Sequence, residues 1–477
     1  MTVADLDLDL DLDHDLDFDL DFDLDLGGPP DDPDGPADCL GGHGYRVLSL
    51  VPAPGGPPPE GEGDVYALVR LRGRPVATVL ARVREGEDPA EVLTAAFLAR
   101  PVNAAVPPAA ASAAARTAAA LPPTTVVVAT RERAGQLARA LDSLLAQDHP
   151  DFRVLVVDNA PVTTATRDLI ETRYAGRVDR VTEPRPGLAV AHNRGVAAAD
   201  GAVIAFTDDD VVADPHWLTA LTAPFTTDPG LGCVTGLILP ARLTTPAQIL
   251  LESHGGFAKG FAPRLYDMAR PPADEPLFPF TAGRFGSGAN MAFRAGALRA
   301  VGGFDPATGT GTPARGGDDL YAFVRVLTEG HRLLYTPDAL VWHHHRETWQ
   351  DLGNQAYGYG AGLTAYLTAI LVRRPALLPA FLAGLPRGLA HARAITAHRA
   401  DGRTGSAPGA DRAVPGVHGA YAHPWPRALS RLERRGMLYG PVGYVRARGR
   451  MRGGRTWTRG GRMWTRGGWT WMRGGRT

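Results

Sequence analysis

Cysteine is scarce in this sequence of 477 residues, which contains only Cys39 and Cys233. The two residues lie far apart in segments of different character, so they provide neither a disulfide framework nor a cysteine-based zinc site. A reducing compartment fits this composition. The N-terminus also lacks the basic segment and the continuous apolar run of a signal peptide. We therefore expect a cytoplasmic protein.

Long apolar runs are scarce as well. The longest apolar stretch with helical character, residues 361–385, is interrupted by Arg373, Arg374, Pro375 and Pro379. Charged residues and prolines at these positions make it a poor membrane-spanning helix. We interpret it as an amphipathic helix packed on the domain or on a partner subunit. Peripheral contact with the cytoplasmic face of a membrane is the alternative.

Basic residues are absent from one end of the chain and acidic residues from the other. Residues 1–40 contain fifteen Asp and no Lys or Arg, mostly in Asp-Leu alternation, and like charges along one face of a strand repel each other. The last 32 residues contain ten Arg and no acid, with four Trp among Arg-Gly-Gly units. We predict a disordered Asp-rich head at residues 1–42 and a disordered Arg/Gly/Trp tail at residues 446–477.

The formal net charge of −1 is a cancellation between these two ends, and the residues between them are nearly neutral. Residues 43–103 are expected to form a small α+β unit, with a hairpin of β-branched runs at residues 65–83 and a helix that begins at Asp88-Pro89. Residues 104–123 are rich in Ala and Pro and are predicted to be a linker. Neither segment shows recognisable chemistry.

From residue 124 onward, apolar strands alternate with helical patterns. Strands are expected at residues 125–130, 153–158, 178–182, 202–207 and 333–342, with helices at residues 137–145, 163–174 and 188–199 between the first four. This alternation predicts an α/β fold with a doubly wound sheet in residues 124–350, followed by a helical region at residues 351–445. In such sheets ligands bind at the carboxyl ends of the strands.

Polar residues follow the predicted strands at these ends. Thr130-Arg131 follows the first strand, Asp158-Asn159 the second, and Asp208-Asp209-Asp210 the fourth. Three carboxylates on one loop repel each other unless water or a divalent cation with oxygen ligands neutralises them. The position after a buried strand favours a metal site. A solvated loop, or the cap of a helix that Asp214-Pro215 begins, is the alternative.

Motifs with further polar residues extend in order along the same segment. They are Thr-Arg-Glu-Arg at 130–133, Leu-Val-Val-Asp-Asn at 155–159, Pro-Gly-Leu-Ala-Val-Ala-His-Asn-Arg-Gly at 186–195, Phe-Thr-Asp-Asp-Asp at 206–210, Gly-Ser-Gly-Ala-Asn-Met at 286–291, Val-Gly-Gly-Phe-Asp at 301–305 and Arg-Gly-Gly-Asp-Asp at 315–319. Together they resemble the family 2 glycosyltransferases. The resemblance implies the GT-A fold, with a doubly wound mixed sheet, and a nucleotide-diphosphate sugar as the donor.

The resemblance also implies roles for the donor side of the site. Thr130 and Arg131 are implied to contact the nucleotide, and Asp158 to hold its base or ribose. Asp208-Asp209-Asp210 matches the Asp-X-Asp element, in which the first acid faces the ribose and the last binds Mn²⁺ or Mg²⁺. We assign Asp208 and Asp209 to substrate binding and Asp210 to the cation, which acts as a Lewis acid on the diphosphate.

On the acceptor side, Asp318-Asp319 stands where the family usually has Glu-Asp. The resemblance implies that Asp319 is the general base that removes the proton of the acceptor hydroxyl. Asp318, a shorter acid than Glu, and Asn290 are assigned to substrate binding. From the residues alone, an acid pair that caps the helix continuing to Leu327 is the alternative.

Three histidines, His343, His344 and His345, end the last predicted strand. Alternate residues of an extended segment face the same way, so His343 and His345 share one side. The family has a histidine that reaches the metal, and the resemblance implies His343, with His345 in reserve. From spacing alone, a solvated turn is the alternative.

The expected activity is the metal-dependent, inverting transfer of a single sugar from a nucleotide-diphosphate sugar to an acceptor hydroxyl, including a lipid-linked one, in glycan or cell-envelope biosynthesis. The Gln-X-X-Arg-Trp signature of processive members does not follow His345. The segment Tyr357-Gly-Tyr-Gly360 either lines the acceptor site or packs a helix.

Two other functions compete with this one. A sugar-nucleotide nucleotidyltransferase is the first, although residues 130–135 offer a single glycine where such enzymes have a Gly-rich phosphate loop. A non-catalytic nucleic-acid-binding protein that acts through the Arg-Gly-Gly tail is the second. No nucleic-acid-binding fold accompanies that tail in the sequence, so we do not expect nucleic acid as a partner.

Overall fold

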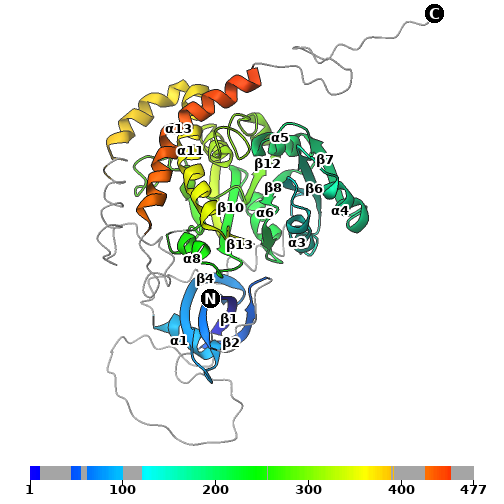
Figure 1. The fold of residues 1–477 in the computed structure, drawn as a ribbon, viewed down its shortest axis with the longest axis vertical. Helices are drawn as coiled ribbons and strands as arrows, with labels where there is room; N and C mark the ends of the chain where they lie inside the picture. Colours follow the sequence, from blue (N-terminus) through cyan, green and yellow to red (C-terminus); the bar gives the residue numbers. More distant parts are fainter. Residues whose placement is uncertain are drawn as a thin grey trace, which may run out of the picture.

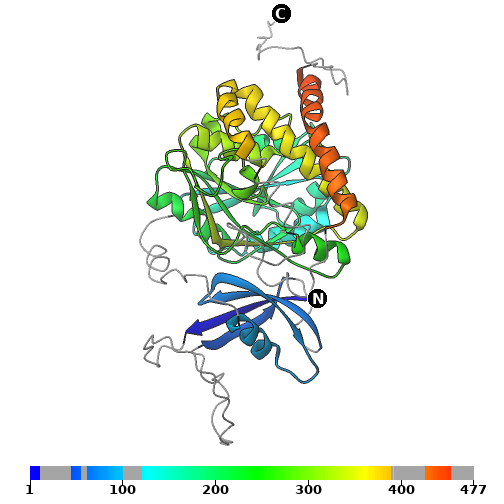
Figure 2. The ribbon, with the colours of Figure 1, turned by 90° about the vertical axis from the view of Figure 1, so that its left-hand side faces the viewer.

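The computed structural model describes residues 1–10, 45–54, 62–99, 121–254, 256–387, 390 and 425–452. They form a small unit built on one β-sheet and a larger α/β unit (Figure 1). Figure 2, in the perpendicular view, shows the small sheet beneath the larger unit and two long C-terminal helices above it. Residues 104–120 of the predicted Ala/Pro linker lie outside the described residues.

The larger unit contains a nine-stranded mixed sheet of order β11-β13-β10-β12-β8-β5-β6-β7, with β9 paired to β13. Its strands are β5 (Thr124–Thr130), β6 (Phe152–Asn159), β7 (Val178–Glu183), β8 (Val203–Asp208), β9 (Val211–Ala213), β10 (Leu231–Pro240), β11 (Arg264–Tyr266), β12 (Asn290–Arg294) and β13 (Arg332–His343). Strands β5 to β8 are parallel to their neighbours in this group, whereas β12 runs antiparallel between β8 and β10. The prediction of an α/β fold with a mixed sheet is confirmed.

Helices cover both faces of this sheet. They are α3 (Ala134–Leu144), α4 (Ala165–Arg173), α5 (Leu188–Ala198), α6 (Trp217–Thr222), α7 (Pro224–Thr227), α8 (Pro246–Ser253), α9 (Ala295–Ala300), α10 (Asp318–Thr328) and α11 (Trp349–Arg373), with the short 3-10 turns η1 (Ala282–Arg284) and η2 (Pro375–Leu377). Helices α5, α10 and α11 share one core with the sheet, and α3, α4 and α6 share the core on the opposite face. The sheet is therefore buried on both sides, as its continuous apolar strands require.

The small unit is a four-stranded sheet of order β2-β1-β3-β4 with α1 (Pro89–Leu98) packed on it. Its strands are β1 (Thr2–Leu10), β2 (Tyr45–Pro52), β3 (Gly63–Leu71) and β4 (Arg74–Val83). The predicted hairpin is present, and its two-residue turn, Arg72 and Gly73, has positive φ at both residues, 50° and 79°. The predicted helix begins as expected, since Asp88 accepts a hydrogen bond from the N–H of Ala90 at 2.8 Å.

The prediction that the whole Asp-rich head is disordered is wrong for residues 2–10. These residues form β1, which pairs with β2 on one side and β3 on the other. Its Leu6 is fully buried, Asp5 accepts two hydrogen bonds from Arg70 Nε at 2.8 and 2.9 Å, and Asp7 accepts one from the N–H of Gly73 at 3.0 Å. An arginine and a backbone donor thus offset the repulsion between the acids. Residues 11–42 lie outside the described residues.

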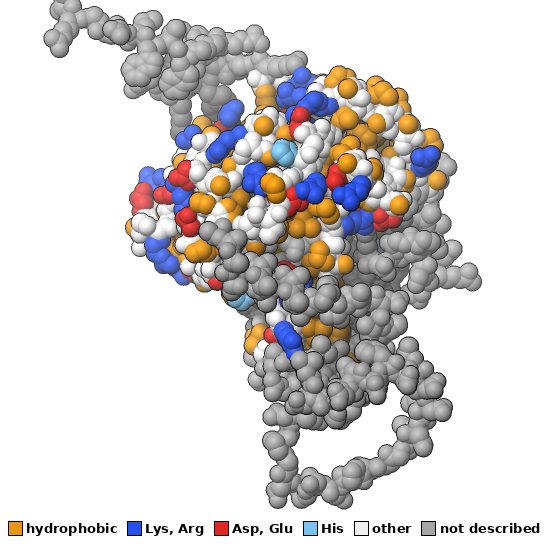
Figure 3. Space-filling view, turned by 180° about the vertical axis from the view of Figure 1, so that it is seen from behind, with side chains coloured by type: hydrophobic (Ala, Val, Ile, Leu, Met, Phe, Trp, Pro, Cys, Tyr) orange, Lys and Arg blue, Asp and Glu red, His pale blue; other side chains and the backbone are white. Residues whose placement is uncertain are grey.

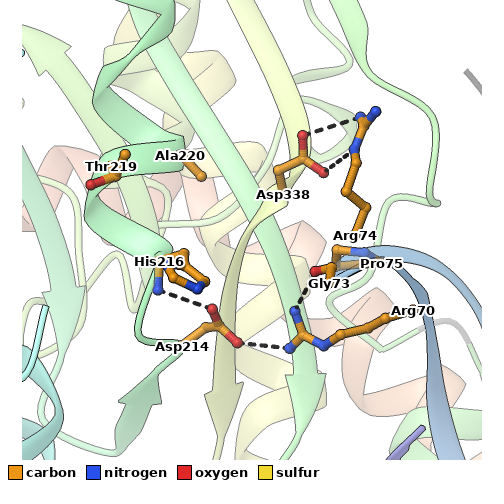
Figure 4. Close-up of a pocket in the computed structure, with 9 residues that line it drawn as sticks. All are labelled: Arg70, Gly73, Arg74, Pro75, Asp214, His216, Thr219, Ala220 and Asp338. Carbon is orange, nitrogen blue, oxygen red and sulfur yellow. Dashed lines mark hydrogen bonds and ion pairs between the residues drawn. The ribbon is translucent and has the colours of Figure 1, made fainter. Parts of the chain in front are cut away.

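The small sheet is docked against β10 and β13 of the larger unit. Tyr66 and Leu68 of β3 pack in one apolar cluster with Leu340 and Trp342 of β13. Figure 4 shows the polar border of this contact, where Arg70 and Arg74 reach Asp214 and Asp338 with N–O distances of 2.7 and 3.2 Å. The two units therefore meet through both apolar packing and buried ion pairs.

The C-terminal helix α13 (Arg427–Arg452) packs along α11. Asp305 joins them, because its Oδ2 accepts hydrogen bonds from Tyr444 of α13 and from Arg373 of α11, both at 3.0 Å. The prediction of disorder from residue 446 is wrong for residues 446–452, which continue α13 because Tyr444 and Ala447 are buried against the domain. Residues 453–477 lie outside the described residues.

No single helix among the described residues is long and apolar enough to cross a membrane. Within the described ranges, one pair, α11 with the helix Pro375–Arg387 bent by 110° from it, meets that test by length and composition.

Candidate active site

Three predicted site residues converge where β8 ends. Asp208 is the last residue of β8, and Asp210 precedes β9, which pairs with the end of β13 through Val211 and His343. This pairing places His343 Nε2 3.4 Å from Asp210 Oδ1. One ligand atom each from Asp208, Asp210 and His343 lies within 4.8 Å of the others, in an arrangement that can hold a metal ion.

The charges in this group favour a cation. Burial, together with the Asp210 and Asp209 carboxylates, raises the pKa of Asp208 to about 7. Burial also acts to raise the pKa of Asp210, but His343, Arg346 and Arg133 outweigh it and hold that pKa below its ordinary range. Two carboxylates and one imidazole are a donor set that suits Mn²⁺ and related divalent cations.

Asp209 lies on the other side of this loop and faces the end of β5. Its Oδ2 accepts a hydrogen bond from Thr130 Oγ1 at 2.7 Å, and its Oδ1 accepts one from Arg133 Nη1 at 2.9 Å. The same Arg133 atom donates to Asp210 Oδ2 at 3.1 Å. Thr130 and Asp209 therefore brace the acidic loop, and Thr130, which is 3 % exposed, uses its hydroxyl on this contact. Sequence reasoning did not single out Arg133.

Asp158 and Arg131 lie at the neighbouring strand ends. Asp158 is buried at the end of β6, with Oδ2 3.4 Å from Arg180 Nη1, and its Oδ1 has no hydrogen-bond partner among the described residues. Burial is the largest cause of its raised pKa. Arg131 is exposed on the loop after β5. Next to it, Glu132 accepts hydrogen bonds from the backbone N–H groups of Val162 and Thr163, which ties this loop to the one after β6.

Asp319 occupies the first turn of α10 and is oriented by two backbone donors. Its Oδ2 accepts from the N–H of Gly288 and its Oδ1 from the N–H of Leu320, both at 2.8 Å. Burial, with the adjacent Asp318 as the next cause, raises its pKa to about 6. The helix start is placed by Gly317, whose φ of 85° and close packing on Gly362 of α11 leave no room for a side chain.

The two acidic loops meet through β12. Gly288, the donor to Asp319, lies just before β12, and Asn290 of β12 pairs with Thr207, the residue before Asp208. The charge of His192 acts on the pKa values of both Asp208 and Asp319. Acids more than 100 positions apart in sequence thus lie at one end of the sheet.

Two predicted substrate-binding residues are buried, and one of them, Asn290, has its amide occupied by contacts in the core. Asn290 is 0 % exposed, and its amide donates to the carbonyls of Leu237 and Ala339 and accepts from Trp217 Nε1, at 2.8 to 2.9 Å. We correct its assignment: it joins strands in the core. Asp318 is 4 % exposed, and its Oδ2 lies 3.2 Å from Nδ1 of His192.

The histidines after β13 divide between two environments. His343 and His345 are both buried, which shows that the alternative of a solvated turn is wrong. His345 Nε2 lies 3.1 Å from Glu252 Oε2, so this imidazole lies behind His343 and outside the group that can hold the metal. His344 faces the opposite way and, with Arg139, lines a cavity of about 600 Å³ that His345 and Arg346 also line.

The segment that contains this site matches a known protein family. Residues 122–357 match the family described as "Glycosyltransferase like family 2". These residues form a family 2 glycosyltransferase domain. The resemblance seen in the sequence is thereby confirmed for residues 122–357.

Two curated relatives match less than half of this chain. A pre-mycofactocin glycosyltransferase of Mycobacterium tuberculosis is 29 % identical over 223 residues, which is 46 % of this chain and 42 % of the relative. A glucosyl-dolichyl phosphate glucuronosyltransferase of Haloferax volcanii is 23 % identical over 227 residues, which is 44 % of this chain and 65 % of the relative. The chain therefore covers less than two thirds of the length of either relative.

Among solved structures, a mannosyltransferase of Pyrobaculum calidifontis in complex with GDP-Man and Mn²⁺ is 22 % identical to this chain. The superposition covers 69 % of this chain and 88 % of the mannosyltransferase, with a TM-score of 0.43.

Several residues of the glycosyltransferase site were missed by sequence reasoning. Arg133 and His192 lie inside motifs that were recognised, and a search for charged partners of the acids within those motifs would have found them. Glu252 lies in α8, in a segment without a motif, and only its burial beside His345 reveals it.

Proposed function

We propose that this glycosyltransferase moves one sugar from a nucleotide-diphosphate sugar to an acceptor hydroxyl, with inversion at the anomeric carbon and with a divalent cation. The observation that carries the proposal is the convergence of Asp208, Asp210 and His343 within 4.8 Å, at the same end of the sheet as the Asp319 carboxylate. The family match favours this function over the nucleotidyltransferase and nucleic-acid-binding alternatives.

Asp208, Asp210 and His343 are proposed to hold the cation. When bound, it supplies positive charge that stabilises the departing nucleoside diphosphate. Asp158, whose buried Oδ1 has no hydrogen-bond partner among the described residues, is proposed to accept a hydrogen bond from the base or ribose. Thr130 and Asp209 support the donor site by holding the acidic loop, and the exposed Arg131 is proposed to contact the nucleotide.

Asp319 is proposed to take the acceptor proton. As the acceptor oxygen bonds to the anomeric carbon, the bond from that carbon to the diphosphate breaks and the hydroxyl proton moves to the carboxylate. The N–H groups of Gly288 and Leu320 fix the carboxylate orientation, and a pKa near 6 makes it a stronger base than an ordinary Asp while it stays ionised at neutral pH. One base on the acceptor side fits a single displacement, which inverts the configuration.

The test is to incubate the purified chain with Mn²⁺ and a panel of nucleotide sugars, with and without glycosyl acceptors. Release of nucleoside diphosphate that depends on Mn²⁺ and on acceptor is expected, and the anomeric configuration of the product is read by NMR. Release of pyrophosphate from nucleoside triphosphates instead would contradict the proposal, and a product that retains the donor configuration would contradict inversion.

The acceptor is proposed to be lipid-linked and the enzyme to act at the surface of an anionic bilayer. The helix Pro375–Arg387 has no charged residue between its ends, and Leu378 and Leu382 are 42 % and 53 % exposed. Arg373, Arg374 and Arg387 flank this apolar surface, which complements anionic headgroups. Figure 3 shows hydrophobic side chains gathered at the upper right, where this helix lies when seen from behind. The name of the Haloferax relative includes a dolichyl phosphate.

Vesicle sedimentation tests this surface with the full chain. Binding to vesicles that contain phosphatidylglycerol is expected, with little binding to pure phosphatidylcholine, and Leu378→Asp with Leu382→Asp is expected to reduce it at least about tenfold. Leu265→Asp, at another exposed leucine, is the matched control. If the double leucine variant binds vesicles as well as Leu265→Asp does, the apolar surface is not the lipid-binding surface. If the chain self-associates and binds no lipid, the surface contacts a second copy of the chain instead.

A further inference from the structure

Buried polar side chains lead from the small sheet to the proposed metal ligand His343. The hydroxyl of Tyr66 in β3 donates to Glu252 Oε1 over 3.4 Å, and Glu252 Oε2 lies 3.1 Å from His345 Nε2. His345 Nδ1 lies 3.1 Å from His343 Nδ1. Tyr66, Glu252 and His345 are 0 %, 1 % and 3 % exposed, so the series is buried, and His345 is its member that borders the cavity lined by His344.

The carboxylate at the start of this series fixes the direction of each hydrogen bond. The two Glu252 oxygens accept from Tyr66 and from His345, so His345 carries its proton on Nε2. A neutral imidazole has one N–H, which makes His345 Nδ1 an acceptor, and His343 must therefore donate from Nδ1. His343 Nε2, which faces Asp210 at 3.4 Å, is left with a free lone pair, and this is the form that binds a cation.

Ring packing holds the same arrangement. Phe257 contacts both imidazoles, with centroid distances of 5.0 Å to His343 and 5.5 Å to His345. The ring planes therefore have little freedom to rotate, and the hydrogen bonds alone select which nitrogen carries the proton.

We propose that Glu252 and His345 are positioning residues that set the tautomer and orientation of His343 for cation binding, and that Tyr66 joins the small N-terminal sheet to them. The proposal rests on the proposed metal role of His343. It assigns His345 to a supporting position rather than to the cation itself, and it gives the small unit a part in building the active site.

The test measures Mn²⁺ affinity of the full chain without substrate, by electron paramagnetic resonance of free Mn²⁺. Glu252→Gln and His345→Leu are expected to weaken binding by about 10- to 100-fold, the usual cost of losing a supporting partner of a metal ligand. His345→Asn keeps an acceptor near the position of Nδ1 and is expected to restore most of the affinity. Glu275→Gln is the control, because Glu275 is equally buried and is held by Thr281 in another part of the domain.

The outcomes separate this proposal from the proposed function. If Asp210→Ala abolishes Mn²⁺ binding while Glu252→Gln and His345→Leu bind like the unaltered chain, the metal site stands and the positioning role is wrong. If His345→Asn is as weak as His345→Leu, His345 is a ligand or a packing residue and the proposed tautomer is wrong. If the unaltered chain binds no Mn²⁺, the proposed metal site fails first. Thermal melts identify any variant that does not fold. If Glu252→Gln does not fold, the comparison of His345→Asn with His345→Leu still tests the positioning role of His345.

Discussion

The two acidic motifs of the domain use neighbouring carboxylates in different ways. In Asp208-Asp209-Asp210, the outer two acids face one point with His343, and the middle one turns back to Thr130 and Arg133. In Asp318-Asp319, which begins a helix, only the second acid faces Gly288 at the site, and the first lies against His192. The loop after β8 thus brings the carboxylates of Asp208 and Asp210 to one point, which suits a cation. The start of α10 instead gives Asp318 and Asp319 different partners, which suits a single base.

The largest effect that this comparison predicts is on Asp319. Asp319→Asn keeps the shape of the side chain but cannot accept a proton, so turnover is expected to fall by about two to four orders of magnitude. Mn²⁺ and donor binding should change little, because the substitution leaves the first motif intact. Steady-state kinetics with calorimetric donor titration measure both. Loss of donor binding equal to the loss of turnover would show that Asp319 is not the base.

The next effect belongs to Asp210. Asp210→Ala removes a proposed ligand, and the affinity for Mn²⁺, and for the donor in its presence, is expected to fall by about 100-fold or more. Asp209→Asn is the matched control within the same motif. It should retain Mn²⁺ binding within about tenfold, because Asp209 faces Thr130 and Arg133. Identical losses in the two variants would remove the distinction between outer and middle acids.

The pH dependence of turnover is the third way to test the comparison. Asp319, the proposed base, can accept a proton only when ionised, and burial with the neighbouring Asp318 raises its pKa to about 6. The active form is therefore present above pH 6 and is lost as the pH falls, so the rate should drop about tenfold per pH unit below that value. A rate that stays flat down to pH 5, in a protein that remains folded, would assign the proton transfer to another group.

Regular repetition along the chain explains why much of the fold was predictable. Strands β5, β6 and β8 were placed within about two residues because each is a continuous apolar run followed by polar residues at the sheet edge. The motif resemblance likewise placed Asp210 and His343 together, since Asp210 follows β8 and His343 ends β13, and the two side chains meet in the group that can hold a metal ion.

The features that the sequence did not reveal depend on partners far away in the chain. Strand β1 is stabilised by Arg70, 65 positions from Asp5, so local charge repulsion alone led to a prediction of disorder. Asn290 was assigned to substrate through the resemblance of its motif to the family, but its partners are the carbonyls of Leu237 and Ala339, and no sequence pattern pairs them with Asn290. Only the folded sheet brings such groups within hydrogen-bond distance.

The smallest predicted effect on turnover is that of Asp318→Asn. This variant tests whether Asp318 acts on Asp319 through its charge or contacts the substrate directly. Asp318→Asn removes a buried charge beside His192, so the free energy of unfolding is expected to fall by about 1–3 kcal/mol. Turnover at neutral pH should remain within about threefold, because the substitution leaves Asp319, the proposed base, and its backbone donors Gly288 and Leu320 in place. The acid limb of the pH–rate profile should move to lower pH, since one cause of the raised pKa of Asp319 has been removed. A large loss of turnover without that displacement would mean that Asp318 contacts the substrate after all, and the two motifs would then use their acids alike.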